Sequence, residues 1–170
     1  MPIDGCTHSF QHLANVVLPA HMETMRQALA KPIPMRTFAA EKHGPKTCAK
    51  HLGLPRDFSG CYVLVEGGKP TYTGISRSVL GRLMQHVRGN THFDASLAYR
   101  IATHRQPHKM HRGKAMDDPA FRGAFEEARE FLRGLDVAFI EIDCPVELYG
   151  FELYCSLELD TGQWNSFRTH

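Results

Sequence analysis

The chain has 170 residues, of which 42% are hydrophobic and 22% are charged, and its formal net charge is +2. This is the composition of a soluble globular protein with enough residues for a real core, and no apolar run approaches the ~20 residues that span a bilayer. The first residues lack the basic and apolar segments of a secretory signal, so we expect a cytoplasmic protein with no membrane association. The five cysteines are scattered, with no CxxC pair, which indicates reduced thiols and neither disulfides nor a zinc site.

Residues 1–58 carry the weakest patterns. A helical pattern runs from Phe10 to Ala30, interrupted at Pro19, and a short second helix is expected over residues 47–52. We interpret this region as a helical extension that packs on the remaining domain, residues 59–170. The alternative is an arm that contacts DNA, because basic and histidine side chains cluster in its second half, at Lys42, His43, Lys46, Lys50 and His51.

Residues 60–76 predict a β-hairpin. Cys61–Val65 alternates β-branched and aromatic residues, which is typical of a strand. Gly67 and Gly68 mark a tight turn, and Thr71–Thr73 forms the second strand, which stops at Gly74.

A helix is predicted directly after the hairpin, over Val79–Arg88, with a serine at position 76 or 78 as its cap. Arg82 and His86 are four residues apart, so they lie one turn apart on one face of this helix. The hairpin and helix together bring two tyrosines, an arginine and a histidine into one short unit.

The second half of the chain predicts two helices, a strand and a last helix. The helices cover residues 93–103 and 117–133, the strand covers 136–142, and the last helix runs from Pro145 to about Leu159. Residues 104–114 are basic and are broken by proline and glycine. Three histidines in this segment have i, i+4, i+7 spacing, but the proline between them favours a flexible phosphate-binding loop over a metal site; they are His104, His108 and His111.

The last helix places one carboxylate in an apolar stripe. Glu152 shares its face with Leu148, Cys155 and Leu159. An ionised carboxylate that faces a core is costly unless it is paired or binds a metal. The residues alone leave both a salt bridge at the edge of the stripe and a metal ligand open.

Several features, taken in order along the chain, resemble the GIY-YIG nuclease family. Gly60-Cys61-Tyr62 matches the first triplet and Tyr72-Thr73-Gly74 the second, and Arg82 and His86 follow at the family's positions. The family has a metal-binding glutamate on a late helix and an asparagine about a dozen residues after it, which match Glu152 and Asn165. The proline that usually precedes the aromatic-Asn pair is absent here. The resemblance covers residues 59–170, with residues 90–135 as an insertion relative to the smallest members.

The resemblance implies a metal-dependent DNA endonuclease with one metal ion. Glu152 would bind Mg²⁺, with Mn²⁺ as a substitute, and Arg82 would bind the scissile phosphate. Tyr72 would act as the general base, with Tyr62 sharing or supporting that role and His86 accepting the proton. Asn165 would orient a phosphate or a water.

The charge distribution favours nucleic acid as the partner. Residues 74–115 contain eight Lys or Arg and one acid, a balance of +7, so the other residues carry twelve bases and seventeen acids, a balance of −5. We expect duplex DNA, with a homodimer or an accessory partner supplying target recognition. The cations expected on the phosphate backbone are Arg77, Arg88, Arg100, Arg105, Lys109, Arg112 and Lys114.

The expected fold is α/β in the mixed (α+β) sense: a small antiparallel sheet of about three strands flanked by helices. The main alternative function is a nucleic-acid-binding module of the same fold that does not cleave. A solvated basic face with no nucleic-acid partner, as in a protein-interaction domain, is the third.

Overall fold

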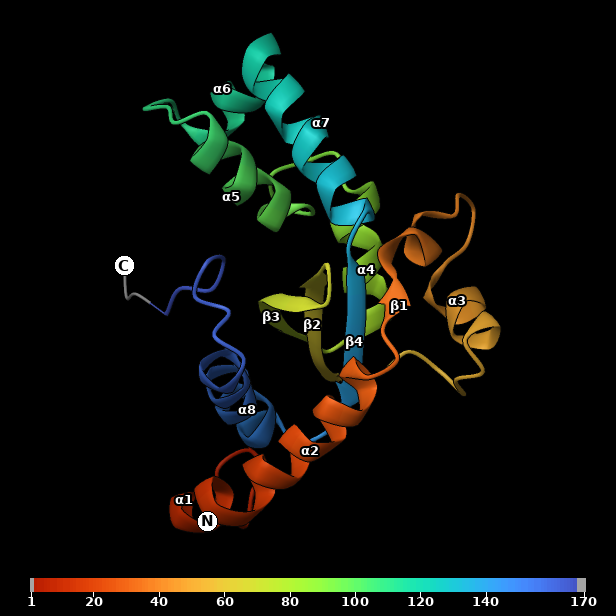
Figure 1. Ribbon diagram of the computed structural model, residues 1–170, viewed down its shortest axis with the longest axis vertical. Helices are drawn as coiled ribbons and strands as arrows, with labels where there is room; N and C mark the ends of the chain where they lie inside the picture. Colours follow the sequence, from red (N-terminus) through yellow and green to blue (C-terminus); the bar gives the residue numbers. More distant parts are fainter. Residues whose placement is uncertain (1, 168–170) are drawn as a thin grey trace. The chain divides into compact units, whose positions relative to one another are not determined.

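The computed structural model describes residues 2–167, and these form two compact units (Figure 1). The sheet unit comprises the described parts of residues 1–33, 56–79 and 136–170. The helical unit comprises residues 34–55 and 80–135. The N-terminal region predicted as one extension is therefore divided between the two units, and the predicted insertion makes up most of the helical unit.

The sheet is antiparallel around its central hairpin, which confirms the predicted mixed α/β class. Its strand order is β1-β4-β2-β3. β2 (Gly60–Glu66) pairs with β3 (Lys69–Ser76) and with β4 (Asp136–Glu141). The turn between β2 and β3 uses Gly67 at φ 55° and Gly68 at φ 84°, a backbone conformation that glycine adopts without strain. The short β1 (Ile33–Pro34) was not predicted.

One face of this sheet carries the core of the sheet unit. Two helices contribute to that core, α2 (Leu18–Leu29) and α8 (Pro145–Glu158). The alternating residues of β2 that point toward them are Cys61, Val63 and Val65. The apolar residues that α2 and α8 contribute are Leu18, Met22, Met25, Leu148, Phe151 and Cys155.

Pro19 does not end the N-terminal helical segment. α1 (Phe10–His12) continues through a π-helical turn, Leu13–Val17, into α2, and Pro19 lies in the first turn of α2. The backbone N–H of Leu18 donates to the carbonyl of Leu13, five residues back. The helical segment is thus continuous across the proline, and the wider π-helical turn lies directly before it, at the place where a proline would otherwise kink an α-helix.

The helical unit is built around two packed helices, α5 (Ser96–Arg105) and α7 (Pro119–Arg133). Asp118 caps α7 by accepting from the N–H of Phe121 at 2.9 Å, as its position before Pro119 predicted. The unit also contains η2 (Met35–Ala39), α3 (Pro45–His51), α6 (Arg112–Asp117) and nearly all of α4 (Val79–Arg88).

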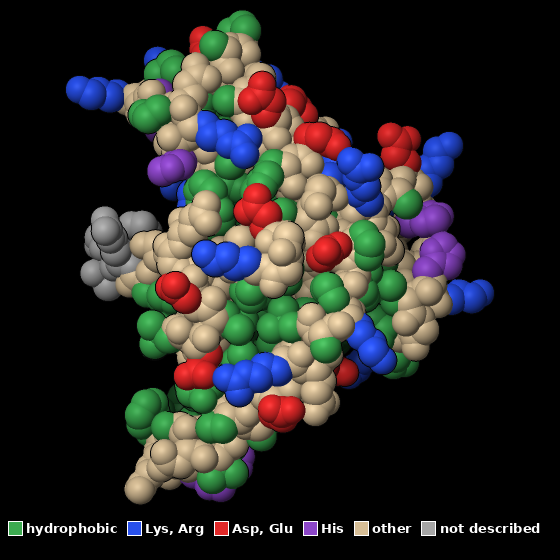
Figure 2. Space-filling view, in the orientation of Figure 1, with side chains coloured by type: hydrophobic (Ala, Val, Ile, Leu, Met, Phe, Trp, Pro, Cys, Tyr) green, Lys and Arg blue, Asp and Glu red, His purple; other side chains and the backbone are tan. Residues whose placement is uncertain are grey.

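Acidic and basic side chains are interspersed over α7. Arg122 pairs with Glu126 at 3.2 Å and Arg133 pairs with Glu130 at 3.1 Å. Red and blue side chains accordingly lie side by side in the upper part of Figure 2. Acids on the same helix therefore offset these two arginines of α7. Within residues 2–167, no helix is both long enough and apolar enough to cross a membrane.

Candidate active site

The two motif tyrosines lie together on one face of the β2–β3 hairpin. Tyr62 is paired in register with Gly74, and Tyr72 with Leu64, so both rings project to the face opposite the α2–α8 core. Their ring centroids are 6.2 Å apart. Tyr62 is 1% exposed, whereas Tyr72 is partly exposed, so Tyr72 is the more accessible of the two phenols.

The motif glycines are required by close packing. A Cβ atom at Gly74 would lie 2.5 Å from the hydroxyl oxygen of Tyr62 and 2.9 Å from the ring of Tyr72. A Cβ atom at Gly60 would lie 2.0 Å from the carbonyl oxygen of Ile140 on the neighbouring strand. The space that a side chain would need at Gly74 is therefore taken by the two tyrosine rings.

Asn165 is fixed to the outer edge of β3. Its Oδ1 accepts from the backbone N–H of Thr73 at 2.8 Å, and its Nδ2 donates to the Thr73 carbonyl at 2.7 Å. β3 is an edge strand, and these outward-pointing backbone groups would otherwise lack a strand partner. Both amide atoms thus hold the C-terminal segment against the second motif triplet, which differs from the predicted role of orienting a phosphate or a water.

Glu152 is a partly buried carboxylate on α8. Burial raises its pKa above the usual value. Among residues 2–167, its carboxylate makes neither an ion pair nor a hydrogen bond, unlike Glu147 and Glu158, which pair with His21 and Arg26. The sequence left a salt bridge and a metal ligand open for Glu152. The described residues offer no partner for the salt bridge.

The surroundings of Glu152 include two thiols that the sequence analysis did not assign. Its negative charge acts on the thiol of Cys61, whose pKa is raised mainly by burial. Cys155 is within hydrogen-bonding reach of Cys61 and of Thr73. For Cys61 the sequence did carry a signal. Side chains alternate along a strand, so the middle residue of the first triplet must face away from Tyr62.

The donor set fits a hydrated hard cation. No group of three or more His, Cys, Asp or Glu side chains converges anywhere within residues 2–167. A lone carboxylate suits Mg²⁺, which keeps several waters and commonly uses one or two carboxylates, better than a metal that needs a cage of protein ligands. Glu152 is then the residue that would hold the ion.

The structure brings the tyrosines together on one face and places α8 with Glu152 on the other. β3 is the edge strand of the sheet, so the two faces meet along it. Tyr72, Gly74 and the Asn165 clamp all lie on this strand. The edge of β3 is therefore where the candidate site of the sheet unit is built.

Arg82 belongs to the helical unit, where its guanidinium is held by three acceptors. Nη1 donates to Gln85 Oε1 at 3.0 Å and to the carbonyl of Asp94 at 2.9 Å, and Nη2 donates to Ser96 Oγ at 2.7 Å. A guanidinium has five N–H donors, so these bonds leave two for a phosphate.

His86, also in the helical unit, is fully buried. Burial, with a smaller contribution from the charge of Arg82, lowers its pKa to about 3. A histidine of this pKa is neutral at physiological pH and is a weak base, which argues against its predicted role as the proton acceptor.

The predicted DNA-binding cations have different environments. Arg88 donates from Nη1 to the carbonyl of His43 at 2.7 Å and from Nη2 to that of Ala40, so it holds residues 40–43 in place within the helical unit. Arg105 lies over the ring of Phe131, at 5.2 Å from the ring centroid. The remaining five are exposed, namely Arg77 in the sheet unit and Arg100, Lys109, Arg112 and Lys114 in the helical unit.

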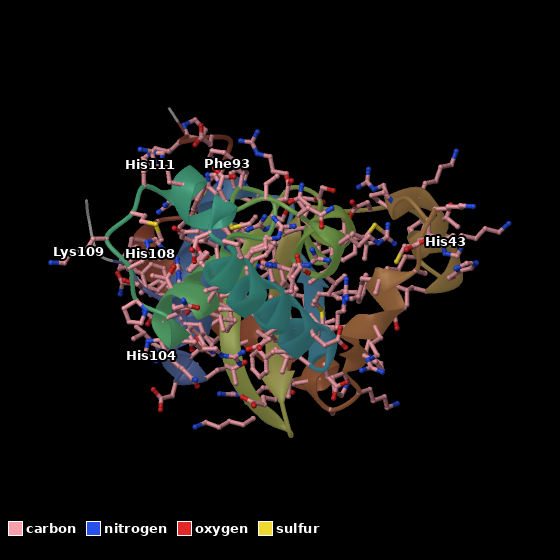
Figure 3. The ribbon with its side chains drawn as sticks, turned by 90° about the horizontal axis from the view of Figure 1, so that it is seen from above. His43, Phe93, His104, His108, Lys109 and His111 are labelled. Carbon is pink, nitrogen blue, oxygen red and sulfur yellow. The ribbon has the colours of Figure 1, made fainter. Side chains whose placement is uncertain are left out.

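The three histidines of residues 104–111 do not form a metal site. His108 Nε2 lies 3.1 Å from the hydroxyl of Tyr99, and its ring packs edge-on against Phe121. His111 caps α6 by accepting from the N–H of Gly113. Figure 3 shows the labelled His104, His108 and His111 at separate places along this segment. The segment predicted as a single loop is thus the end of α5, a short loop and the start of α6.

Searches with family models, among curated proteins and among solved structures found no match to this chain.

Proposed function

We propose that the protein is a metal-dependent DNA endonuclease whose chemistry takes place at the edge of β3. The observation that carries the proposal is Glu152: a desolvated carboxylate with no ion-pair partner among residues 2–167, on the helix packed behind a hairpin with two clustered tyrosines. A desolvated acid without a partner costs stability, and such groups concentrate at functional sites.

In this proposal the hydrolysis of a phosphodiester is divided among few residues. Tyr72, the more exposed of the two, would act in its phenolate form, taking the proton of the attacking water and becoming a neutral phenol, and Tyr62 packs beside it and holds the ring in place. Gly74 lets the two rings approach the backbone, and Asn165 keeps the edge of β3 in register. Within the helical unit, Arg82 keeps two donors for a phosphate, which is the role that the family resemblance implies for it.

The cation bound by Glu152 would supply positive charge for the phosphoryl oxygens and the leaving oxygen. The carboxylate must be ionised to hold it. Because burial raises the pKa of Glu152, cation binding and deprotonation of this side chain favour each other. Binding of the metal should therefore weaken as the pH falls toward the raised pKa.

The test is plasmid cleavage in magnesium by the Glu152→Gln variant. Gln has nearly the same shape but lacks the charge that a hard cation needs, so we expect cleavage to fall by at least about 10²-fold. DNA binding in EDTA should persist. Glu158→Gln is the matched control, because Glu158 lies on the same helix in an exposed ion pair with Arg26, and this variant should cleave like the wild type.

A stability measurement separates lost chemistry from lost folding. Removing a desolvated negative charge should leave the thermal midpoint of Glu152→Gln unchanged or higher at neutral pH. Cleavage at the wild-type rate by this variant would refute the metal-ligand assignment. DNA binding by the wild type with no cleavage in magnesium or manganese would instead support the non-cleaving module.

A further inference from the structure

The helical unit contains a cavity of ≈ 380 Å³ beside α5, here called the α5 pocket. Four side chains that line it are cationic or can become so: Arg100, Arg112, His92 and His104. No aspartate or glutamate is among its lining residues. Its volume lies in the range of small-molecule sites, and its charge selects for an anion.

Hydroxyl groups add directed hydrogen bonding to this charge. Ser96 Oγ lines the pocket and accepts from Arg82 at 2.7 Å, so its own O–H remains to donate to a ligand. Thr103, another lining residue, donates to the carbonyl of Tyr99 at 2.9 Å. Two guanidinium groups and a hydroxyl donor form a typical environment for phosphate oxygens.

The wall behind these groups is packed. Tyr99 is 8% exposed, its hydroxyl lies 3.1 Å from His108 Nε2, and its ring lies 5.2 Å from that of Phe121 on α7. Arg112 lies over the ring of Tyr99, 5.8 Å from the ring centroid. The wall of the pocket is therefore formed without a ligand, and one of its cations, Arg112, is positioned over that wall before binding.

An exposed aromatic side chain lies next to the pocket. The ring of His92, a lining residue, lies against Phe93 in a tilted arrangement with centroids 4.0 Å apart, and Phe93 is 74% exposed. An exposed aromatic ring beside a phosphate site can stack on a nucleobase.

We propose that the α5 pocket binds the phosphate of a single nucleotide, whose base stacks on Phe93. The nucleotide is either a free nucleoside monophosphate or the phosphorylated end of a DNA strand, which present the same chemistry to the pocket. This inference goes beyond the proposed nuclease, because binding here requires neither cleavage nor Glu152.

The experiment is isothermal titration calorimetry of the full chain in EDTA with five probes. Three are small: inorganic phosphate, a nucleoside 5′-monophosphate and the corresponding nucleoside. The other two are a short single-stranded oligonucleotide with a 5′-phosphate and the same oligonucleotide without it. We expect the monophosphate to bind and the nucleoside to bind at least about tenfold more weakly. Arg100→Gln and Arg112→Gln should each weaken binding of the monophosphate by about tenfold. Phe93→Ala should weaken binding of the monophosphate but leave binding of inorganic phosphate unchanged.

Arg36→Ala is the control, since Arg36 is an exposed arginine of the same unit outside the pocket and should not affect binding. A phosphorylated oligonucleotide that binds more tightly than both its unphosphorylated form and the free nucleotide identifies a strand end as the ligand. If the phosphorylated oligonucleotide and the free nucleotide bind with equal affinity, the ligand is the free monophosphate. Equal binding of nucleoside and monophosphate, or unchanged affinity in both arginine variants, would overturn the proposal.

The wild-type protein alone provides a second measurement if a variant does not fold. The ring C–H resonances of His92 and His104 should shift when the monophosphate is added, while those of His12, in the sheet unit, should not. An absence of shifts at saturating monophosphate would also overturn the proposal. Because no step depends on magnesium, failure here leaves the nuclease test unaffected, and failure of the nuclease test leaves this one unaffected.

Discussion

Acidification should destabilise the helical unit through His86. Its folded-state pKa of about 3 lies below the ordinary value of 6.5, so the unfolded chain binds the proton more tightly. The stabilisation is present above about pH 6.5 and is lost as the pH falls toward 3. At ~1.36 kcal/mol per pKa unit, the whole loss is about 5 kcal/mol, of which about 2 kcal/mol falls between pH 7 and pH 5.

The assay is urea denaturation followed by circular dichroism between pH 4 and pH 8. Unshifted carboxylates titrate mainly below pH 5, so the loss between pH 7 and pH 5 reports chiefly on histidines. His86→Gln cannot take up a proton in this range. We expect this variant to be less stable at pH 7, because a packed ring is lost, and to show a smaller decrease between pH 7 and pH 5 than the wild type.

His51→Gln is the control, since His51 is an exposed histidine of the same unit and its loss should leave the pH dependence unchanged. Nuclear magnetic resonance titration gives the direct measurement: the ring of His86 should show no protonation down to about pH 4. A midpoint for His86 near pH 6.5, or the same pH dependence in His86→Gln and the wild type, would refute the reasoning.

Three further variants test the candidate site and the basic surface. Gly74→Ala should displace both tyrosine rings, destabilise the protein by about 1–3 kcal/mol in urea and reduce cleavage; wild-type stability would contradict the close packing. Asn165→Leu should leave two backbone groups of the β3 edge without their amide partner, which speeds hydrogen exchange at the Thr73 amide; unchanged exchange would refute the clamp. Replacing Arg105, Lys109 and Arg112 by Ala in a catalytically inactive protein should reduce the slope of log K for duplex DNA against log salt by about 0.9 per lost contact, whereas an unchanged slope means that these cations do not contact DNA.

The fold was predictable where short-range patterns determine it. The strands β2, β3 and β4 followed from alternation, and α7 followed from its Asp118-Pro119 start. The π-helical turn before Pro19 was not predictable, because a helix can either end or continue at a proline. Here the helix continues, and its residues beyond the proline pack into the core. α6 was missed because Pro107 and Gly113 predicted a loop and the helix has only six residues.

The candidate site was only partly predictable. The tyrosine cluster followed from the spacing of the two triplets, and its geometry is present. The clamp between Asn165 and Thr73 joins residues 92 positions apart, and local patterns carry no information on such a pair. The burial of His86 did have a signal, because it continues the spacing of Val79 and Leu83, so it belongs to the apolar stripe of α4 as well as lying one turn after Arg82.

The site residues of the sheet unit are of two physical kinds, and this division bears on the nuclease proposal. Asn165 and Gly74 support the structure around them, because one completes the hydrogen bonds of an edge strand and the other makes room for two rings. Glu152 does the opposite, since its charge is desolvated and has no ion-pair partner among residues 2–167. Changes of the first kind should lower stability and activity together, whereas Glu152→Gln should lower activity alone. A residue that costs stability is expected where binding or chemistry requires it. Loss of activity together with stability at Asn165 and Gly74, but loss of activity alone at Glu152, therefore tests the proposal more directly than a loss of activity at any one of them.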